Sequence, residues 1–84
     1  MPNPTVRRVL TTVPNSDGTI SLIKESHRPD GHVSIIHRIR DPNGRTVLVL
    51  HYVYNPHEQI VHGPEETFRR PGYQGQPDLA VPRR

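Results

Sequence analysis

With 84 residues, 31% of them hydrophobic, ten prolines and six glycines, the chain holds one domain at most and excludes a TIM barrel, a doubly wound dinucleotide fold and a multidomain enzyme. The absence of cysteine excludes a disulfide scaffold, a thiolate zinc site and a cysteine nucleophile. The net charge of +3, carried by ten Arg and one Lys, favours a nucleic-acid partner, although codon usage in a GC-rich genome would also enrich arginine.

Turn signals divide the first two thirds of the chain. The tetrads that end at Gly18, Gly31 and Gly44 place Asn, Asp, Ser or Pro before glycine, which is typical of a type I turn with a G1 bulge in a β-hairpin. A fourth turn, residues 55–58, lacks the glycine. The segments between these turns are rich in Val, Ile, Thr and Tyr. They predict strands over residues 5–13, 19–27, 32–40 and 45–54, and a short fifth strand over residues 59–62.

The segment after these strands carries helix signals. Pro64 precedes two glutamates, and two arginines follow, an order that predicts a helix of one or two turns over residues 64–70. We therefore predict a mostly β protein, a small antiparallel meander of four to five strands with one short C-terminal helix, in a single domain over residues 1–70. The Pro/Gly-rich tail, residues 71–84, is predicted to be extended or disordered unless it docks on a partner.

The hairpin loops also predict register. A three-residue loop with a G1 bulge in the second and third hairpins sets Ile23 opposite His37 and Ile35 opposite both Glu25 and His51. One sheet face then carries His37, His51 and Glu25 among most of the aliphatic side chains. A two-residue turn in the third hairpin would instead move every side chain of the following strand to the other face, and His51 would then no longer lie beside His37 and Glu25.

His37, His51 and Glu25 are the predicted catalytic residues. Two histidines and a carboxylate can supply the general base and general acid for metal-independent RNA cleavage. The cation that this chemistry needs is missing from their face, because Arg38 and Arg40 lie on the other one. Two alternatives remain open for the same residues, a metal site of two histidines and one carboxylate, and core or interface histidines with hydrogen-bonding roles only. We expect no metal and no cofactor.

The opposite face predicts nucleic-acid binding. Two tyrosines at strand spacing and four cations on neighbouring strands describe a surface for base stacking and phosphate contact. The alternative is that the tyrosines are ordinary strand residues. The predicted nucleic-acid-binding residues are Arg8, Lys24, Arg38, Arg40, Tyr52 and Tyr54. The histidines beside the fourth turn, His57 and His62, are interpreted as polar loop residues.

No family is identified from the sequence. The turn at residues 41–45, followed by Tyr52 and the Tyr54–Asn55 pair, resembles hairpin-repeat segments of large bacterial surface proteins. A small, basic, His-rich β domain is also similar in composition to the ribonuclease tips of bacterial contact-dependent toxins. Neither resemblance assigns a role to a residue.

The leading hypothesis is a small basic protein that engages RNA, with a toxin-like metal-independent ribonuclease as its catalytic form. The alternative is a non-catalytic homodimeric assembly or adaptor protein that presents a sheet face or its C-terminal tail to a protein partner. A homodimer is expected in either case, because both faces of the sheet are half apolar. No apolar run approaches the roughly 20 residues of a membrane span, and no signal peptide is recognised, so a cytoplasmic location is expected.

Overall fold

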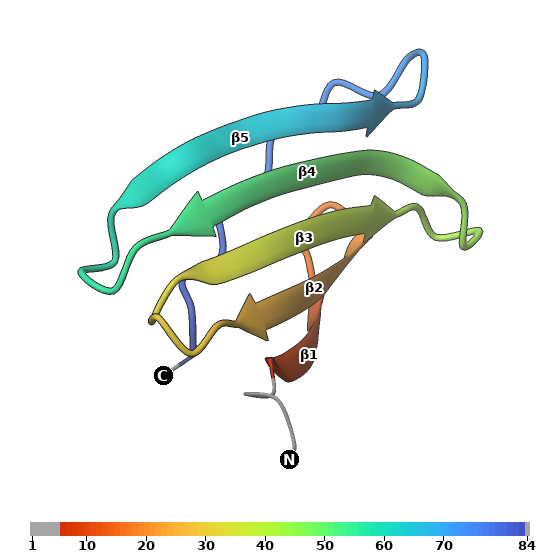
Figure 1. The fold of residues 1–84 in the computed structure, drawn as a ribbon. Helices are drawn as coiled ribbons and strands as arrows, with labels where there is room; N and C mark the ends of the chain where they lie inside the picture. Colours follow the sequence, from red (N-terminus) through yellow and green to blue (C-terminus); the bar gives the residue numbers. More distant parts are fainter. Residues whose placement is uncertain (1–5, 84) are drawn as a thin grey trace.

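The computed structural model describes residues 6–83, which form a single five-stranded antiparallel sheet (Figure 1). The strands lie side by side in chain order, so the predicted mostly β meander is confirmed. Thr5, where the first strand was expected to begin, and Arg84 lie outside the described residues. The strands are β1 (Arg7–Pro14), β2 (Ile20–His27), β3 (Val33–Arg40), β4 (Thr46–Tyr54) and β5 (Ile60–Arg69).

The turns follow the glycine signals. Gly18, Gly31 and Gly44 have φ angles of 88°, 91° and 83°, a region that residues with a side chain rarely adopt. In the third turn, Asp41 N donates to Arg45 O at 2.8 Å. These hydrogen-bonded turns force consecutive strands to pair as neighbours, which produces the meander.

The register of the β3–β4 hairpin differs from the prediction. The β2–β3 pairs are as predicted, with Ile23 opposite His37. In the β3–β4 pair, Arg40 faces Thr46 but Ile39 faces Leu48, so one extra residue forms a bulge. From there onward the parity of β4 is inverted, because one inserted residue moves every following side chain to the other face.

The predicted helix over residues 64–70 is wrong. Residues 64–69 belong to β5, which ends at Arg69 and pairs with β4 through Glu65 opposite His51 and Phe68 opposite Val49. The region described by the structure contains no helix, and hence no helix that could cross a membrane. A helix of two turns is marginal by itself, whereas a fifth strand satisfies the backbone edge of β4.

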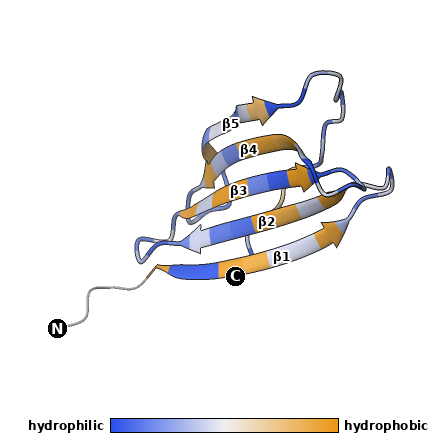
Figure 2. Ribbon diagram, turned by 90° about the vertical axis from the view of Figure 1, so that its right-hand side faces the viewer, coloured by the Kyte–Doolittle hydropathy of each residue, from blue (hydrophilic) through white to orange (hydrophobic). Residues whose placement is uncertain are grey.

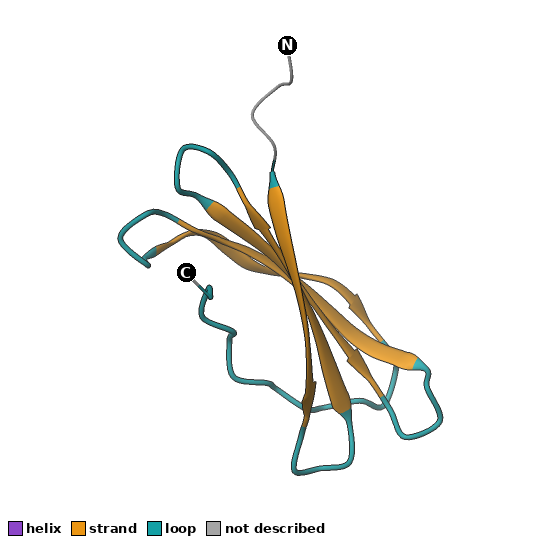
Figure 3. Cartoon of the chain, turned by 90° about the horizontal axis from the view of Figure 1, so that it is seen from below, coloured by secondary structure: helices purple, strands orange, loops and turns teal. Residues whose placement is uncertain are grey.

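The C-terminal tail, residues 71–83, has no helix or strand and packs against one face of the sheet (Figure 3). We call this covered side the inner face. Its core contains the fully buried Val33, Ile35 and Tyr52, and the tail residues Leu79 and Ala80 pack against it. The tail therefore serves as the second layer that an open sheet needs to bury its apolar face.

The opposite side of the sheet, the outer face, has no covering layer within residues 6–83 (Figures 1 and 3). Polar and apolar residues are interleaved along the strands (Figure 2), as expected for strands with two different faces. Several large apolar side chains remain accessible on the outer face. They include Leu10, which is 77% exposed, together with Ile36 and Phe68.

Candidate functional site

The outer face carries four exposed cations. Each occupies an even-numbered position of β1, β2 or β3, and the pairing register of these strands brings their even positions to one face. None of the four has an ion pair or a side-chain hydrogen bond within residues 6–83. Glu25, the one carboxylate in β1–β4, lies on the inner face. The four cations are Arg8, Lys24, Arg38 and Arg40.

An apolar groove lies among these cations. Leu10, Leu22 and Ile36 line it together with Lys24 and Arg38. The groove runs across β1, β2 and β3, because Leu10, Lys24 and Ile36 are direct cross-strand neighbours. Apolar lining beside cations suits a ligand with both a planar apolar part and an anionic part.

The predicted register required Tyr52 and Tyr54 to share a face with these cations. In the structure they do not. The bulge at the start of β4 places both rings on the inner face, where their exposed fractions are 0% and 6%. The two rings pack edge to face with centroids 5.9 Å apart. Burial beneath the tail removes them as stacking surfaces for bases.

The predicted catalytic residues do not come together either. His37 and Glu25 lie on the inner face and are 2% and 1% exposed. His51 is opposite Ile36, so its side chain projects from the outer face. The inserted residue in β4 therefore separates the two histidines by the thickness of the sheet.

His37 lies within a chain of hydrogen bonds on the inner face. Its Nδ1 is 3.2 Å from the Tyr52 hydroxyl, and its Nε2 is 2.8 Å from Oγ of Ser21. The Tyr52 hydroxyl accepts the Ala80 N–H, and donation of its own proton to Nδ1 would leave neutral His37 with its ring proton on Nε2, facing Ser21. Burial lowers the pKa of His37 below its usual value of 6.5, since the charged form loses hydration.

Glu25 holds the end of the tail. Its Oε1 accepts a hydrogen bond of 2.8 Å from the backbone N–H of Arg83 and lies 2.8 Å from Nε2 of His27. A buried carboxylate requires such partners, because an unpaired one costs several kcal/mol. Both contacts explain the burial of Glu25 structurally.

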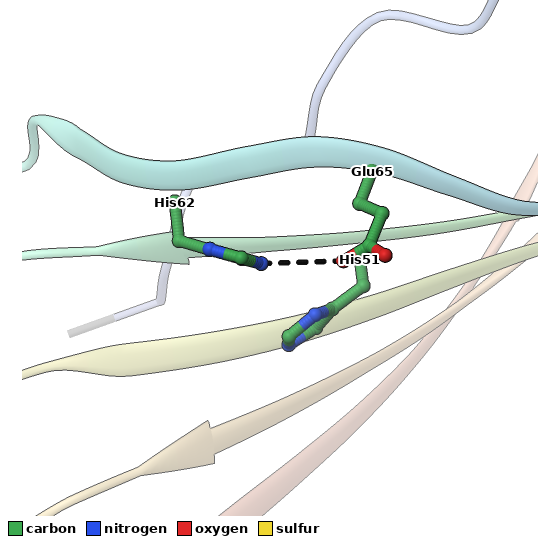
Figure 4. A group of neighbouring side chains, drawn as sticks. All are labelled: His51, His62 and Glu65. Carbon is green, nitrogen blue, oxygen red and sulfur yellow. Dashed lines mark hydrogen bonds and ion pairs between the residues drawn. The ribbon is translucent and has the colours of Figure 1, made fainter.

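A second cluster of titratable side chains forms on the outer face, across β4 and β5 (Figure 4). His51, His62 and Glu65 each offer one ligand atom, and these atoms lie within 4.8 Å of one another. Nε2 of His62 is 3.3 Å from Oε2 of Glu65, and the two imidazole centroids are 5.4 Å apart. Oγ of Ser34 lies 3.0 Å from Nε2 of His51. Two imidazoles and one carboxylate form a donor set that transition metals accept.

A bulge in β5 explains why His62 and Glu65 share a face. Residues three apart in a regular strand point to opposite sides. Here Val53 faces His62 and His51 faces Glu65, so Tyr52 is opposite two residues instead of one. Gly63, one of these two residues, has a φ of 79°. A Cβ at this position would lie 2.5 Å from the His51 carbonyl oxygen, so only glycine fits.

This cluster was not predicted from the sequence. His62 was interpreted as a polar loop residue at the end of the predicted strand over residues 59–62, and Glu65 was placed in the predicted helix, so the two were expected on separate elements. The overlooked signal is Gly63 within a segment of β-forming residues, because glycine inside a strand often marks a bulge. A bulge at that point would have brought both side chains to the same side of an extended fifth strand.

Comparisons with known proteins add no functional assignment. No protein-family model matches the chain, and no curated protein or solved structure shows significant similarity to it. The function is therefore inferred from the geometry of the outer face.

Proposed function

We propose that the chain binds single-stranded RNA across the outer face of its sheet. The observation that carries the proposal is the set of four exposed, unpaired cations, Arg8, Lys24, Arg38 and Arg40, on a face of β1–β4 without a carboxylate. Cations on neighbouring strands can follow a phosphate backbone, and contacts with phosphate supply most of the affinity in sequence-independent binding.

The apolar side chains on this face support a single-stranded ligand. The groove lined by Leu10, Leu22 and Ile36 offers apolar contact to an unstacked base. Phe68 is 43% exposed on the same face of β5, with the guanidinium carbon of Arg70 6.0 Å from its ring centroid. Bases in a duplex are already stacked, so these contacts favour single strands.

The cations also argue against self-association through the outer face. In a two-fold dimer, the same patch of each copy faces its partner. The four cations of one copy would then oppose the four of the other, at the cost of like-charge repulsion and of their hydration. A polyanion covers the same surface and removes that repulsion.

The proposal contains no cleavage step. His37 and Glu25 are buried beneath the tail, and His51 projects from the other side of the sheet. A general acid and a general base must both reach the same phosphodiester, so binding is the activity that the arrangement supports.

The test measures the affinity for a labelled single-stranded RNA by fluorescence anisotropy, in EDTA, as a function of salt concentration. Four phosphate contacts predict a slope of log K against log salt of roughly −3, at about −0.7 for each contact. The double variant Lys24→Gln/Arg38→Gln should bind more weakly and reduce the slope by about 1.4.

The matched control is Arg28→Gln/Arg45→Gln, which removes the same charge from two exposed turn residues outside the strands that carry the four cations. This control should leave the slope nearly unchanged. Absence of binding at low salt, or an equal loss in both double variants, would overturn the proposal. A dimer in sedimentation equilibrium that Leu10→Arg dissociates would also overturn it, because the outer face would then be covered by a second copy.

A further inference from the structure

We propose that His51, His62 and Glu65 form a binding site for a divalent first-row transition metal ion, with Zn²⁺ as the best match. This site is separate from the proposed RNA binding. RNA binding is to be measured in EDTA and therefore does not depend on a metal ion. The observation is geometric, because one ligand atom from each of the three residues lies within 4.8 Å of the other two.

One of the three separations between ligand atoms already matches a zinc site. Zn²⁺ binds imidazole nitrogen and carboxylate oxygen at about 2.0–2.2 Å, so tetrahedral ligand atoms lie roughly 3.3–3.6 Å apart. Nε2 of His62 and Oε2 of Glu65 already lie 3.3 Å apart. Closing the remaining separation requires only side-chain rotation, because His62 and Glu65 are exposed and their exposed torsions are free to change.

The backbone supplies the arrangement. His51 and Glu65 are direct cross-strand partners, and the bulge at Gly63 brings His62 to their face. Two of the ligands therefore come from β5 and one from β4, on paired strands that hold their Cα positions. Ligands on rigid strands reduce the conformational entropy that metal binding must overcome.

Ser34 acts on the site through His51. A hydrogen bond from Nε2–H of His51 to Oγ of Ser34, over the observed 3.0 Å, leaves the lone pair on Nδ1 for a metal ion. Such an outer contact fixes the tautomer and orientation of a ligating imidazole. Ser34 is thus a positioning residue, and its loss should weaken binding less than the loss of a ligand.

The donor set selects the class of ion. Mg²⁺ and Ca²⁺ require oxygen ligands, whereas imidazole suits Zn²⁺ and its first-row neighbours. Three protein ligands leave a fourth tetrahedral position open toward the solvent on the outer face. The probe that separates these classes is Zn²⁺ compared with Mg²⁺.

Isothermal titration calorimetry of the full chain with Zn²⁺ tests the proposal. We expect one Zn²⁺ site and no detectable Mg²⁺ binding. His62→Gln and Glu65→Gln should each weaken Zn²⁺ binding more than roughly tenfold, and Ser34→Ala by about tenfold. Both ligand variants change exposed side chains, so circular dichroism should show an unchanged fold.

The matched control is His57→Gln, which removes an exposed histidine of the β4–β5 turn that is not part of the cluster. It should leave the affinity unchanged. Zn²⁺ binding that survives both ligand variants, or that His57→Gln weakens equally, would overturn the site. If His62→Gln or Glu65→Gln abolishes Zn²⁺ binding and leaves RNA binding unchanged, the metal site is supported independently of the proposed function.

Discussion

The backbone amide of Ala80 donates a hydrogen bond of 2.7 Å to the hydroxyl of Tyr52, whose side chain is completely buried. The carbonyl of Ala80 accepts a second hydrogen bond, of 2.9 Å, from the hydroxyl of Tyr54. Both polar backbone groups of one tail residue are thus held by β4. Because Leu79 and Ala80 cover the core of the inner face, these two tyrosines link the docking of the tail to the stability of the sheet.

Replacing Tyr52 by phenylalanine should destabilise the protein by about 1–3 kcal/mol, because the Ala80 N–H and His37 Nδ1 both lose a buried partner. Urea denaturation measures the change in the free energy of unfolding. Tyr54→Phe is the matched control, since it removes one hydrogen bond, to the Ala80 carbonyl, and should cost less. Equal costs for the two variants would show that the hydroxyl of Tyr52 has no special role.

Alkaline pH should destabilise the fold through the buried hydroxyl of Tyr52, which holds Ala80 of the tail. Burial raises the pKa of Tyr52 from 10.0 to about 12, so the unfolded chain loses its proton first. The stabilising contribution is complete below pH 10 and is lost as pH rises toward 12, by up to about 3 kcal/mol. Burial also raises the pKa of Tyr54 and Tyr73. The difference in pH dependence between the wild type and Tyr52→Phe isolates Tyr52, and parallel curves would refute its role.

Mild acid should destabilise the fold through His37. Burial lowers the pKa of this residue below 6.5, so the unfolded state binds the proton more readily than the folded state. Stability is therefore complete above about pH 6.5 and declines as pH falls below that value. Protonation would also place an Nδ1–H donor against the Tyr52 hydroxyl, whose oxygen already accepts from Ala80. His37→Gln should show a flatter dependence of the thermal midpoint between about pH 7.5 and pH 5, and an unchanged dependence would contradict this assignment.

Turn residues predicted the order of the strands in the sheet correctly, but they predicted the pairing register of only some of the strands. Turn residues with a glycine at positive φ are local signals, and they placed Gly18, Gly31 and Gly44 correctly. The same turn signals correctly predicted the β2–β3 register. The predicted β3–β4 register is wrong after Arg40, where one residue of β4 bulges so that Val47 and Leu48 are both buried. Such a bulge depends on the packing of the inner face beneath the tail, which no local pattern encodes.

The extra residue at the start of β4 decides which predicted site residues share a face. The four cations stayed on one face because they lie on β1–β3, before the bulge. His51 lies after it, so the predicted cluster with His37 did not form. The charges of residues 64–70 suited a helix, but the unpaired edge of β4 is a tertiary feature that converts them into a strand. Tertiary pairing commonly overrides weak local propensity of this kind.

The bulge in β5 can be tested by adding one methyl group. Gly63→Ala places a Cβ at a φ of 79° and within 2.5 Å of the His51 carbonyl oxygen. Gly44→Ala is the matched control, because Gly44 has a φ of 83° with no heavy atom within 4 Å of the added Cβ. The control should cost about 1–2 kcal/mol from backbone conformation alone. Gly63→Ala should cost a further 1–3 kcal/mol or so, since backbone must move.

Urea denaturation of both glycine variants measures these free energies, and Zn²⁺ titration reports on the side chains above the bulge. If Gly63→Ala shifts the pairing of β5 by one residue, His62 leaves the face that carries His51. The stability loss should then be accompanied by loss of Zn²⁺ binding, whereas Gly44→Ala should keep it. Equal destabilisation by the two variants would mean that β5 accommodates a side chain at residue 63, and that the close approach to the His51 carbonyl does not hold the strand in place.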